Sequence, residues 1–153
     1  MDIKDFLRPA DVITGLRVAD KTGLLKDLSG RAAASVGLDA AGIAQAVLGR
    51  EQLGSTGMGG GVAIPHARIT GLKRPFGILA CIKRPIAFDA IDGKPVDVFF
   101  VLLLPADADP DHLHALASVA RVLRDPALVR KLRKAPDSVQ AYRCLVGESN
   151  MSS

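Results

Sequence analysis

Apolar residues recur at helical spacing in two stretches of the first third of the chain. The first stretch follows Asp20 and ends before Gly37, and its inward positions are Leu24, Leu25, Leu28 and Ala32. The second follows Asp39 and ends near Arg50, and its inward positions are Ile43, Ala44, Val47 and Leu48. An Asp carboxylate accepts a free N–H at a helix start, and glycine suits the left-handed residue that follows a helix end. The pattern predicts helices at about 20–37 and 39–50.

The middle of the chain has the pattern of strands. Short apolar runs occupy 62–64, 77–82 and 96–104, and Pro85, Pro95 and Pro105 separate them from their neighbours. Since the last run is apolar almost throughout, we expect a central strand that is covered on both faces.

The last third is helical again. Asp109-Pro110 and Asp125-Pro126 each place a capping carboxylate before a proline at the first helical position. Asp137 or Ser138 starts a terminal helix. Helices before and after central strands predict an α/β layered domain with a mixed sheet.

Composition limits the class of protein. The chain has 153 residues, of which 48% are hydrophobic and 24% charged, as is usual for one folded domain. We expect residues 1–146 to form that domain and the small, polar residues 147–153 to be disordered. The two cysteines lie far apart in apolar surroundings, which favours free buried thiols.

The same composition argues against membranes and nucleic acids as partners. No apolar run reaches the ~20 residues of a spanning helix, and the first residues lack the pattern of a signal peptide, so we expect a cytoplasmic protein with peripheral or no membrane contact. Aromatic residues make up 4% of the chain and the formal net charge is +4. This excess is too small to indicate nucleic-acid binding.

Glycines are concentrated in one segment, with five of them between Gly54 and Gly61. Such a loop either points backbone N–H groups at a phosphate or forms a tight turn into the strand at 62–64. Neither a Walker sequence nor G-x-G-x-x-G is present. The spacing alone leaves both interpretations open.

Three histidines are candidates for chemistry. His66 follows Pro65 at the end of the predicted strand, where ligands bind in α/β sheets. A fixed neutral imidazole there is either a nucleophile towards phosphorus or a structural residue. His112 and His114 lie at a predicted helix start, two positions apart, so at most one faces the same site. We expect His114 to be a surface residue.

Other chemistries have little support in the sequence. No metal-binding spacing joins the histidines to nearby carboxylates, and G-x-S-x-G is absent, so neither a metal site nor a serine hydrolase is predicted. The basic residues are interpreted as the solvated face of two helices, with an acidic docking partner as the alternative: Arg121, Arg124, Arg130, Lys131, Arg133 and Lys134.

Four segments together resemble one protein family. They are REQLGSTG at 50–57, GVAIPH at 61–66, PIAFDAIDGKPVD at 85–97 and HLHAL at 112–116. The chain resembles the enzyme IIA proteins of the phosphoenolpyruvate-dependent phosphotransferase system, in the fructose/mannitol/nitrogen class, and most of all the nitrogen-regulatory type. The similarity runs from about residue 6 to residue 142, nearly the whole chain.

The resemblance implies a fold and a site. The fold is a single-domain layered sandwich, with a mixed, mostly parallel sheet and helices on both faces. His66 matches the phosphorylated histidine, His112 a second histidine beside it, and Arg50 an arginine that binds phosphoryl oxygens. Residues 55–57 (Ser55, Thr56 and Gly57) match the turn that binds or supports the phosphate. Ala67 and Gly60 depart from the usual Gly and Asn of the family.

The resemblance also implies a function. The chain would be a phosphotransferase component that accepts a phosphoryl group on His66 from a histidine-phosphorylated, HPr-like carrier protein, without metal, nucleotide or other cofactor. Its phosphorylation state would select regulatory targets such as potassium transport regulators or sensor kinases. Two alternatives remain: a sugar-transport IIA component that passes phosphate to a IIB domain, and a binding module that acts without phosphorylation.

Overall fold

The computed structural model describes residues 1–107 and 109–151, and side chains as far as residue 147. Five α-helices are present in this part: α1 Lys21–Val36, α2 Ala40–Gln52, α3 Pro110–Leu123, α4 Pro126–Lys134 and α5 Ser138–Met151. The strands are β1 Val12–Leu16, β2 Gly57–Gly59, β3 Val62–Ala63, β4 His66–Ile69, β5 Phe76–Ile86 and β6 Val96–Pro105. Two short 3-10 turns, η1 Ile3–Asp5 and η2 Pro9–Asp11, precede β1.

The helix ends confirm the predicted caps. The Asp20 carboxylate accepts the N–H of Gly23 at 2.8 Å, and Gly37 follows α1 with a φ of +72°. Asp109 and Asp125 cap α3 and α4 in the same way, each followed by proline at the first helical position. The helix starts are therefore encoded locally.

The sheet is mixed and mostly parallel, as the resemblance implies. Its strand order is β1-β5-β6-β3-β2, and β4 also pairs with β6. The pairs β1/β5, β3/β6 and β4/β6 are parallel, whereas β5/β6 and β2/β3 are antiparallel. The central strand β6 is buried along nearly its whole length, which confirms the expectation from its apolar run.

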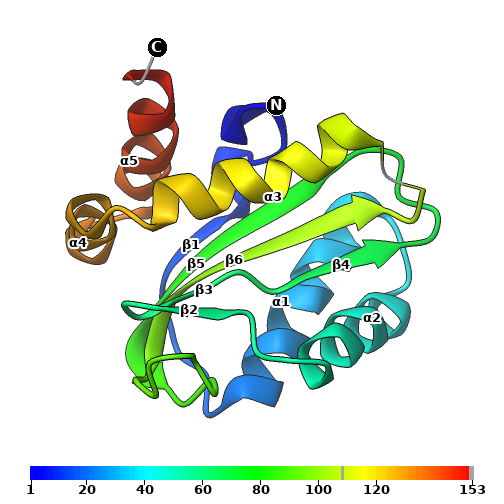
Figure 1. The fold of residues 1–153 in the computed structure, drawn as a ribbon, viewed down its shortest axis with the longest axis horizontal. Coiled ribbons are helices and arrows are strands. Elements are labelled where there is room, and N and C mark those ends of the chain that lie inside the picture. The colour runs from blue at the N-terminus through cyan, green and yellow to red at the C-terminus, as the bar shows by residue number, and fades with distance from the viewer. Residues whose placement is uncertain (108, 152–153) are drawn as a thin grey trace.

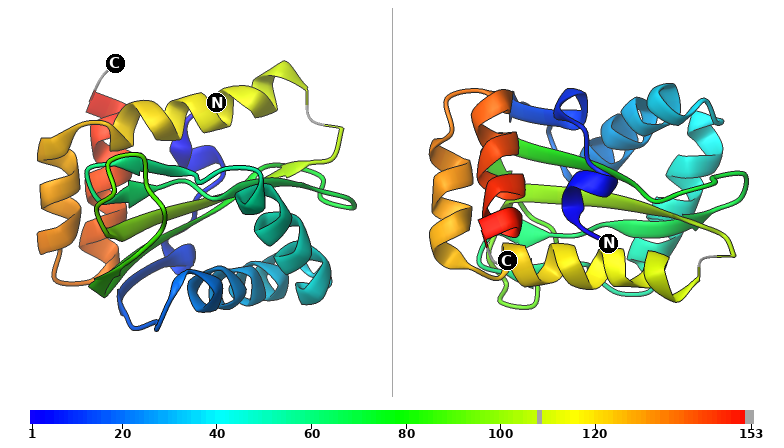
Figure 2. Two further views of the ribbon diagram at one scale, coloured as in Figure 1. Left: turned by 60° about the horizontal axis from the view of Figure 1, so that its bottom comes forward. Right: turned by 90° about the horizontal axis from the view of Figure 1, so that it is seen from above.

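Helices cover both faces of the sheet, as Figures 1 and 2 show. On one face, Phe99, Val101 and Leu103 of β6 pack in a core with the apolar side chains of α1 and α2. On the other face, Phe100 and Leu102 pack with those of α3, α4 and α5. The alternation along β6 divides the interior into two layers.

Some elements differ from the sequence prediction. β1, β2 and β4 were not predicted, and each has at most five residues. α5 extends to Met151, and residues 152–153 of the tail lie outside the described part, so the disordered tail at 147–153 stays a prediction. Cys81 and Cys144 are free thiols, as predicted, but only Cys81 is buried and Cys144 is partly exposed. Within the described residues, no helix is long and apolar enough to cross a membrane.

Candidate functional site

His66 faces the layer that contains α3. It is the first residue of β4 and pairs with Leu102 of β6, while Ala67 pairs with Leu103. Paired residues on neighbouring strands project from the same face of a sheet. Leu102 belongs to the core beneath α3, and Leu103 belongs to the opposite core. The imidazole is half-buried and projects on the α3 side.

One ring nitrogen of His66 is held by the backbone. Nδ1 lies 2.8 Å from the carbonyl oxygen of Ile64. A carbonyl oxygen only accepts, so in the neutral ring Nδ1 carries the proton and donates it, and Nε2 carries the lone pair. Nε2 has no hydrogen-bond partner among residues 1–107 and 109–147. The ring is therefore oriented with its nucleophilic nitrogen free.

His112 lies on the face of α3 that packs against the sheet. It lies three and seven residues before Ala115 and Val119, two α3 residues that are fully buried against the sheet. Its side chain is 21% exposed, and its Nδ1 is buried without a hydrogen-bond partner, 3.7 Å from an Asp109 carboxylate oxygen. The structure thus directs His66 and His112 to the same layer between the sheet and α3, with no hydrogen bond between them. His114 is exposed, as predicted.

No hydrogen bond or ion pair joins Arg50 to His66 or His112. It lies in the last turn of α2, and its Nη1 donates to the carbonyl oxygen of Gly54 at 2.9 Å. This bond closes the end of the helix onto the segment that leads to the glycine turn. The remaining guanidinium N–H groups form no further hydrogen bond or ion pair with the described residues.

The hydroxyl groups at 55–57 are engaged by the protein. Ser55 Oγ donates to the carbonyl oxygen of Phe88 at 2.7 Å and accepts the N–H of Gly57 at 3.0 Å. Thr56 Oγ1 donates to one Glu51 carboxylate oxygen at 2.7 Å, and the Thr56 N–H donates to the other at 2.8 Å. These bonds fix the path of the backbone between α2 and β2.

Glu51 is a residue of the site region to which the sequence analysis assigned no role. It is 6% exposed and forms an ion pair with Lys21 at 3.1 Å in addition to its two bonds from Thr56. Thr56 in turn accepts the N–H of Ile64 through its carbonyl oxygen at 3.1 Å. A continuous path of hydrogen bonds therefore joins Glu51 to the Ile64 carbonyl that holds His66. The signal for it was an acid on the inward stripe of α2, four residues after Val47.

The glycine segment forms a tight turn between β2 and β3. Gly60 donates its N–H to Asp92 at 3.0 Å, and its carbonyl oxygen accepts from Arg133 at 2.8 Å. Backbone N–H groups of Lys94 and, to a smaller extent, Gly60 lower the pKa of Asp92. Arg133 also binds the Asp97 carboxylate at 2.9 and 3.0 Å. Arg133 is exposed, as the prediction of a solvated basic face requires, but its guanidinium also binds this turn, which the sequence did not predict.

No metal centre is formed by the described residues. Among residues 1–107 and 109–147 there is no group of three His, Cys, Asp or Glu side chains that could hold an ion. Cys81 is buried, and burial raises the pKa of its thiol to about 12. A thiol with so high a pKa is a poor nucleophile at neutral pH.

Known proteins resemble the chain along most of its length. The family model described as "Phosphoenolpyruvate-dependent sugar phosphotransferase system, EIIA 2" matches residues 5–147. A nitrogen regulatory protein of Bradyrhizobium diazoefficiens is 41% identical over 145 residues, 95% of each chain. The crystal structure of nitrogen regulatory protein IIA-Ntr from Neisseria meningitidis has a TM-score of 0.88 and 31% identity, covering 94% of this chain and 98% of that one.

A more distant structure shares the fold alone. It is enzyme IIA for mannitol from Escherichia coli, solved in complex with phosphorylated enzyme IIB for mannitol. The TM-score is 0.77 and the identity 15%, with 93% of this chain and 99% of that chain covered.

Proposed function

Since the chain belongs to the EIIA 2 family of the phosphoenolpyruvate-dependent sugar phosphotransferase system, we propose that it is a phosphoryl carrier whose acceptor is Nε2 of His66. The observation that carries this proposal is the 2.8 Å contact between Nδ1 of His66 and the carbonyl oxygen of Ile64. It holds the proton on Nδ1, so the lone pair of Nε2 is available for attack without a separate base.

The transfer step needs one bond to form and one to break. The donor is a phosphohistidine of an HPr-like carrier protein. Nε2 of His66 bonds to phosphorus as the N–P bond of the donor breaks, and that bonding pair returns to the donor imidazole. The phosphorylated His66 ring keeps its proton on Nδ1 and gains positive charge. The Ile64 carbonyl dipole stabilises this charge through the hydrogen bond already present.

Two further side chains offer N–H donors to the phosphoryl oxygens. His112 projects from the opposite side of the same layer and has no hydrogen bond at Nδ1, so its ring is free to turn an N–H towards a phosphoryl oxygen. Arg50 uses one Nη for Gly54 and retains the other donors of its guanidinium fork. Donors of this kind stabilise the developing charge of phosphoryl transfer, so no metal, nucleotide or other cofactor enters the step.

The turn at 55–57 supports the site instead of binding the phosphate. The hydroxyl groups of Ser55 and Thr56 already donate to Phe88 and Glu51, and the Gly57 N–H donates to Ser55. Their role is to hold Thr56, whose carbonyl oxygen accepts the N–H of Ile64. In this way they position the carbonyl group that orients His66.

Exposed apolar side chains on the segments that carry Arg50, Asp92 and His112 are compatible with a protein donor. Leu53 follows α2, Ile91 precedes Asp92, and Leu113 follows His112; they are 84%, 86% and 44% exposed. Apolar side chains of this accessibility mark a protein-binding surface where they form one patch. They suit contact with the carrier protein around His66.

Regulation by phosphorylation state is the role we favour. The identity of 41% with a nitrogen regulatory protein supports it. A phosphoryl group adds about two negative charges, which is enough to change which partner binds. The targets would be proteins of the regulatory kind, such as potassium transport regulators or sensor kinases. A sugar-type role, with transfer onward to a IIB domain, is the alternative that the mannitol IIA–IIB complex illustrates for the same fold.

The experiment is a transfer assay with purified components. The protein is incubated with phosphoenolpyruvate, enzyme I and the carrier protein, and its intact mass is measured beside that of His66→Ala and His114→Ala. We expect one acid-labile phosphoryl group on the wild type and on His114→Ala, and none on His66→Ala. Failure of the wild type to accept phosphate from a verifiably phosphorylated carrier would leave the phosphorylation-independent binding module as the better account. Adding a IIB domain then separates the sugar role from the regulatory one.

A further inference from the structure

A cleft of about 520 Å³ lies between the N-terminal segment, the end of α1 and the loop that joins β4 to β5. None of the residues that line it belongs to the His66 site or to the segment at 50–66. Its size is that of sites that bind small organic molecules. The transfer mechanism makes no use of it.

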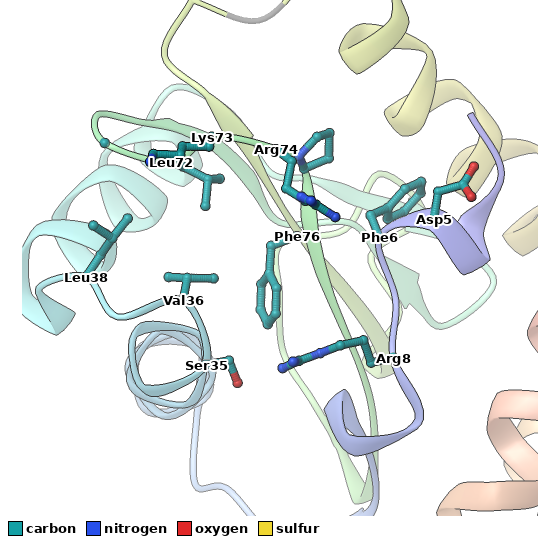
Figure 3. A pocket seen from close by; sticks show the side chains of 12 residues that line it. Asp5, Phe6, Arg8, Ser35, Val36, Leu38, Leu72, Lys73, Arg74 and Phe76 are labelled. Atoms are coloured by element: carbon teal, nitrogen blue, oxygen red, sulfur yellow. The ribbon is translucent and has the colours of Figure 1, made fainter.

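One wall of the cleft is apolar and partly open to solvent. Val36, Leu38 and Leu72 are half-buried and lie along one side, as Figure 3 shows. Phe6 and Phe76 are buried and pack behind the cleft. This wall provides a surface for the flat apolar part of a ligand.

The side opposite this wall is cationic. Figure 3 shows Arg8 and Arg74 across from Val36 and Leu38, on either side of Phe76. Lys73 also lines the cleft, beside Leu72, and Asp5 is an acidic residue at its edge. Arg74 and Lys73 have no ion-pair partner among the residues that the structure describes. Their charges are therefore available to a bound anion.

The guanidinium of Arg8 is held in place by a buried carboxylate. Its Nε donates to Asp11 at 2.7 Å, and Asp11 is only 6% exposed. Ser35, another residue that lines the cleft, donates to the other oxygen of Asp11 at 3.1 Å. The guanidinium carbon lies 5.9 Å from the centre of the Phe76 ring. With Nε engaged, the two terminal nitrogens remain as a pre-oriented pair of donors for an anion.

We propose that this cleft binds a phosphate monoester attached to a planar apolar ring, the chemistry of a nucleoside monophosphate. The ring would lie on Val36, Leu38 and Leu72, and the phosphate would bind Arg8 and Arg74. Two guanidinium groups suit the nearly two charges of a phosphate monoester better than the single charge of a carboxylate.

The test is an NMR titration of the 15N-labelled protein with AMP, and with adenosine and inorganic phosphate as the two halves of the probe. We expect AMP to shift the backbone amides at 35–38 and 71–77 in a saturable way, and each half to bind at least about tenfold more weakly, since each lacks one set of contacts. Binding of adenosine or phosphate as tightly as AMP would overturn the proposal. So would shifts centred on His66, or no saturable shifts.

Substitutions test which side chains bind AMP. Arg74→Gln removes a charge that has no intramolecular ion-pair partner, so it leaves the fold intact; it should weaken AMP binding by about tenfold or more. Arg8→Lys keeps the charge opposite Asp11 but loses the two-pronged donor, and should also weaken binding. Arg121→Gln on α3 is the matched control and should bind as the wild type does. Equal affinities of Arg74→Gln and Arg121→Gln would contradict the assignment.

Discussion

The Nδ1 atom of His66 lies 2.8 Å from the carbonyl oxygen of Ile64, two residues earlier in the chain. Pro65, between them, fixes the backbone path, and its carbonyl oxygen accepts the N–H of Leu102 in β6 at 2.9 Å. The histidine is therefore oriented by the sheet itself. Several measurable consequences follow from the way this carbonyl and its surroundings are held.

His112 should matter to phosphoryl transfer and His114 should not. His112 lies on the inward stripe of α3 with an unpartnered ring nitrogen, whereas His114 is exposed. We expect His112→Ala to slow transfer from the carrier protein by at least about tenfold, because removing one donor to a developing charge costs that much or more. His114→Ala should remain within about twofold. Rapid-quench measurement of the transfer rate compares the two, and similar rates would remove His112 from the mechanism.

Thr56 should stabilise the fold through Glu51. Thr56→Val keeps the shape of the side chain but leaves one buried oxygen of Glu51 without its donor. We expect a loss of about 1–3 kcal/mol in the free energy of unfolding. The exposed Thr22 of α1 provides the control, and Thr22→Val should change the free energy of unfolding by less than about 0.5 kcal/mol. Urea unfolding measures both; equal effects would show that the Glu51 bond contributes nothing.

Alanine substitutions at the two neighbouring glycines of the turn should destabilise the protein to different extents. Gly60 and Gly61 both have positive φ values, +67° and +81°. A Cβ at Gly60 would meet open space, but one at Gly61 would collide with the Arg133 guanidinium. Gly61→Ala should therefore destabilise the protein more than Gly60→Ala, which bears only the cost of the left-handed conformation, about 1–2 kcal/mol. Thermal unfolding compares them, and a milder effect at Gly61 would contradict the arrangement of Arg133.

Asp92 should make the turn sensitive to acid. Backbone N–H groups of Lys94 and Gly60 lower its pKa in the folded protein. The stability it contributes is present above the unfolded value of about 3.9 and is lost as the pH falls through the lower, folded value. The difference in unfolding free energy between wild type and Asp92→Asn should be constant from pH 7 to about 5 and shrink below about 4. A difference that does not vary with pH would contradict this role.

The sequence predicts the elements whose signals are local. Asp20, Asp39 and Asp109 cap helices at the expected residues, and the long apolar run of β6 lies at the centre of the sheet. The missed strands carry weak signals. β1 contains Gly15 with a φ of +70° and an irregular register, and β4 begins directly after a proline. Both are strands because neighbouring strands pair with them, which their own residues do not show.

The features of the site also differ in whether the sequence predicts them. His66 and the inward orientation of His112 follow from motif and helical spacing. Three features could not be predicted: the contact of His66 with the Ile64 carbonyl, the Glu51–Thr56 bonds and the hydrogen bond from Arg133 to Gly60. They depend on backbone geometry or join residues up to 73 positions apart. Phosphate binding by Arg50 remains a prediction.

The central claim is that Nε2 of His66 accepts the phosphoryl group. The most direct test is 15N–31P correlation NMR on the protein labelled with 15N-histidine and phosphorylated by the carrier protein. The account predicts that phosphorus couples to Nε2 of His66, and that Nδ1 keeps its proton and its hydrogen bond to Ile64. Coupling to Nδ1 of His66, or to a nitrogen of His112, would contradict it.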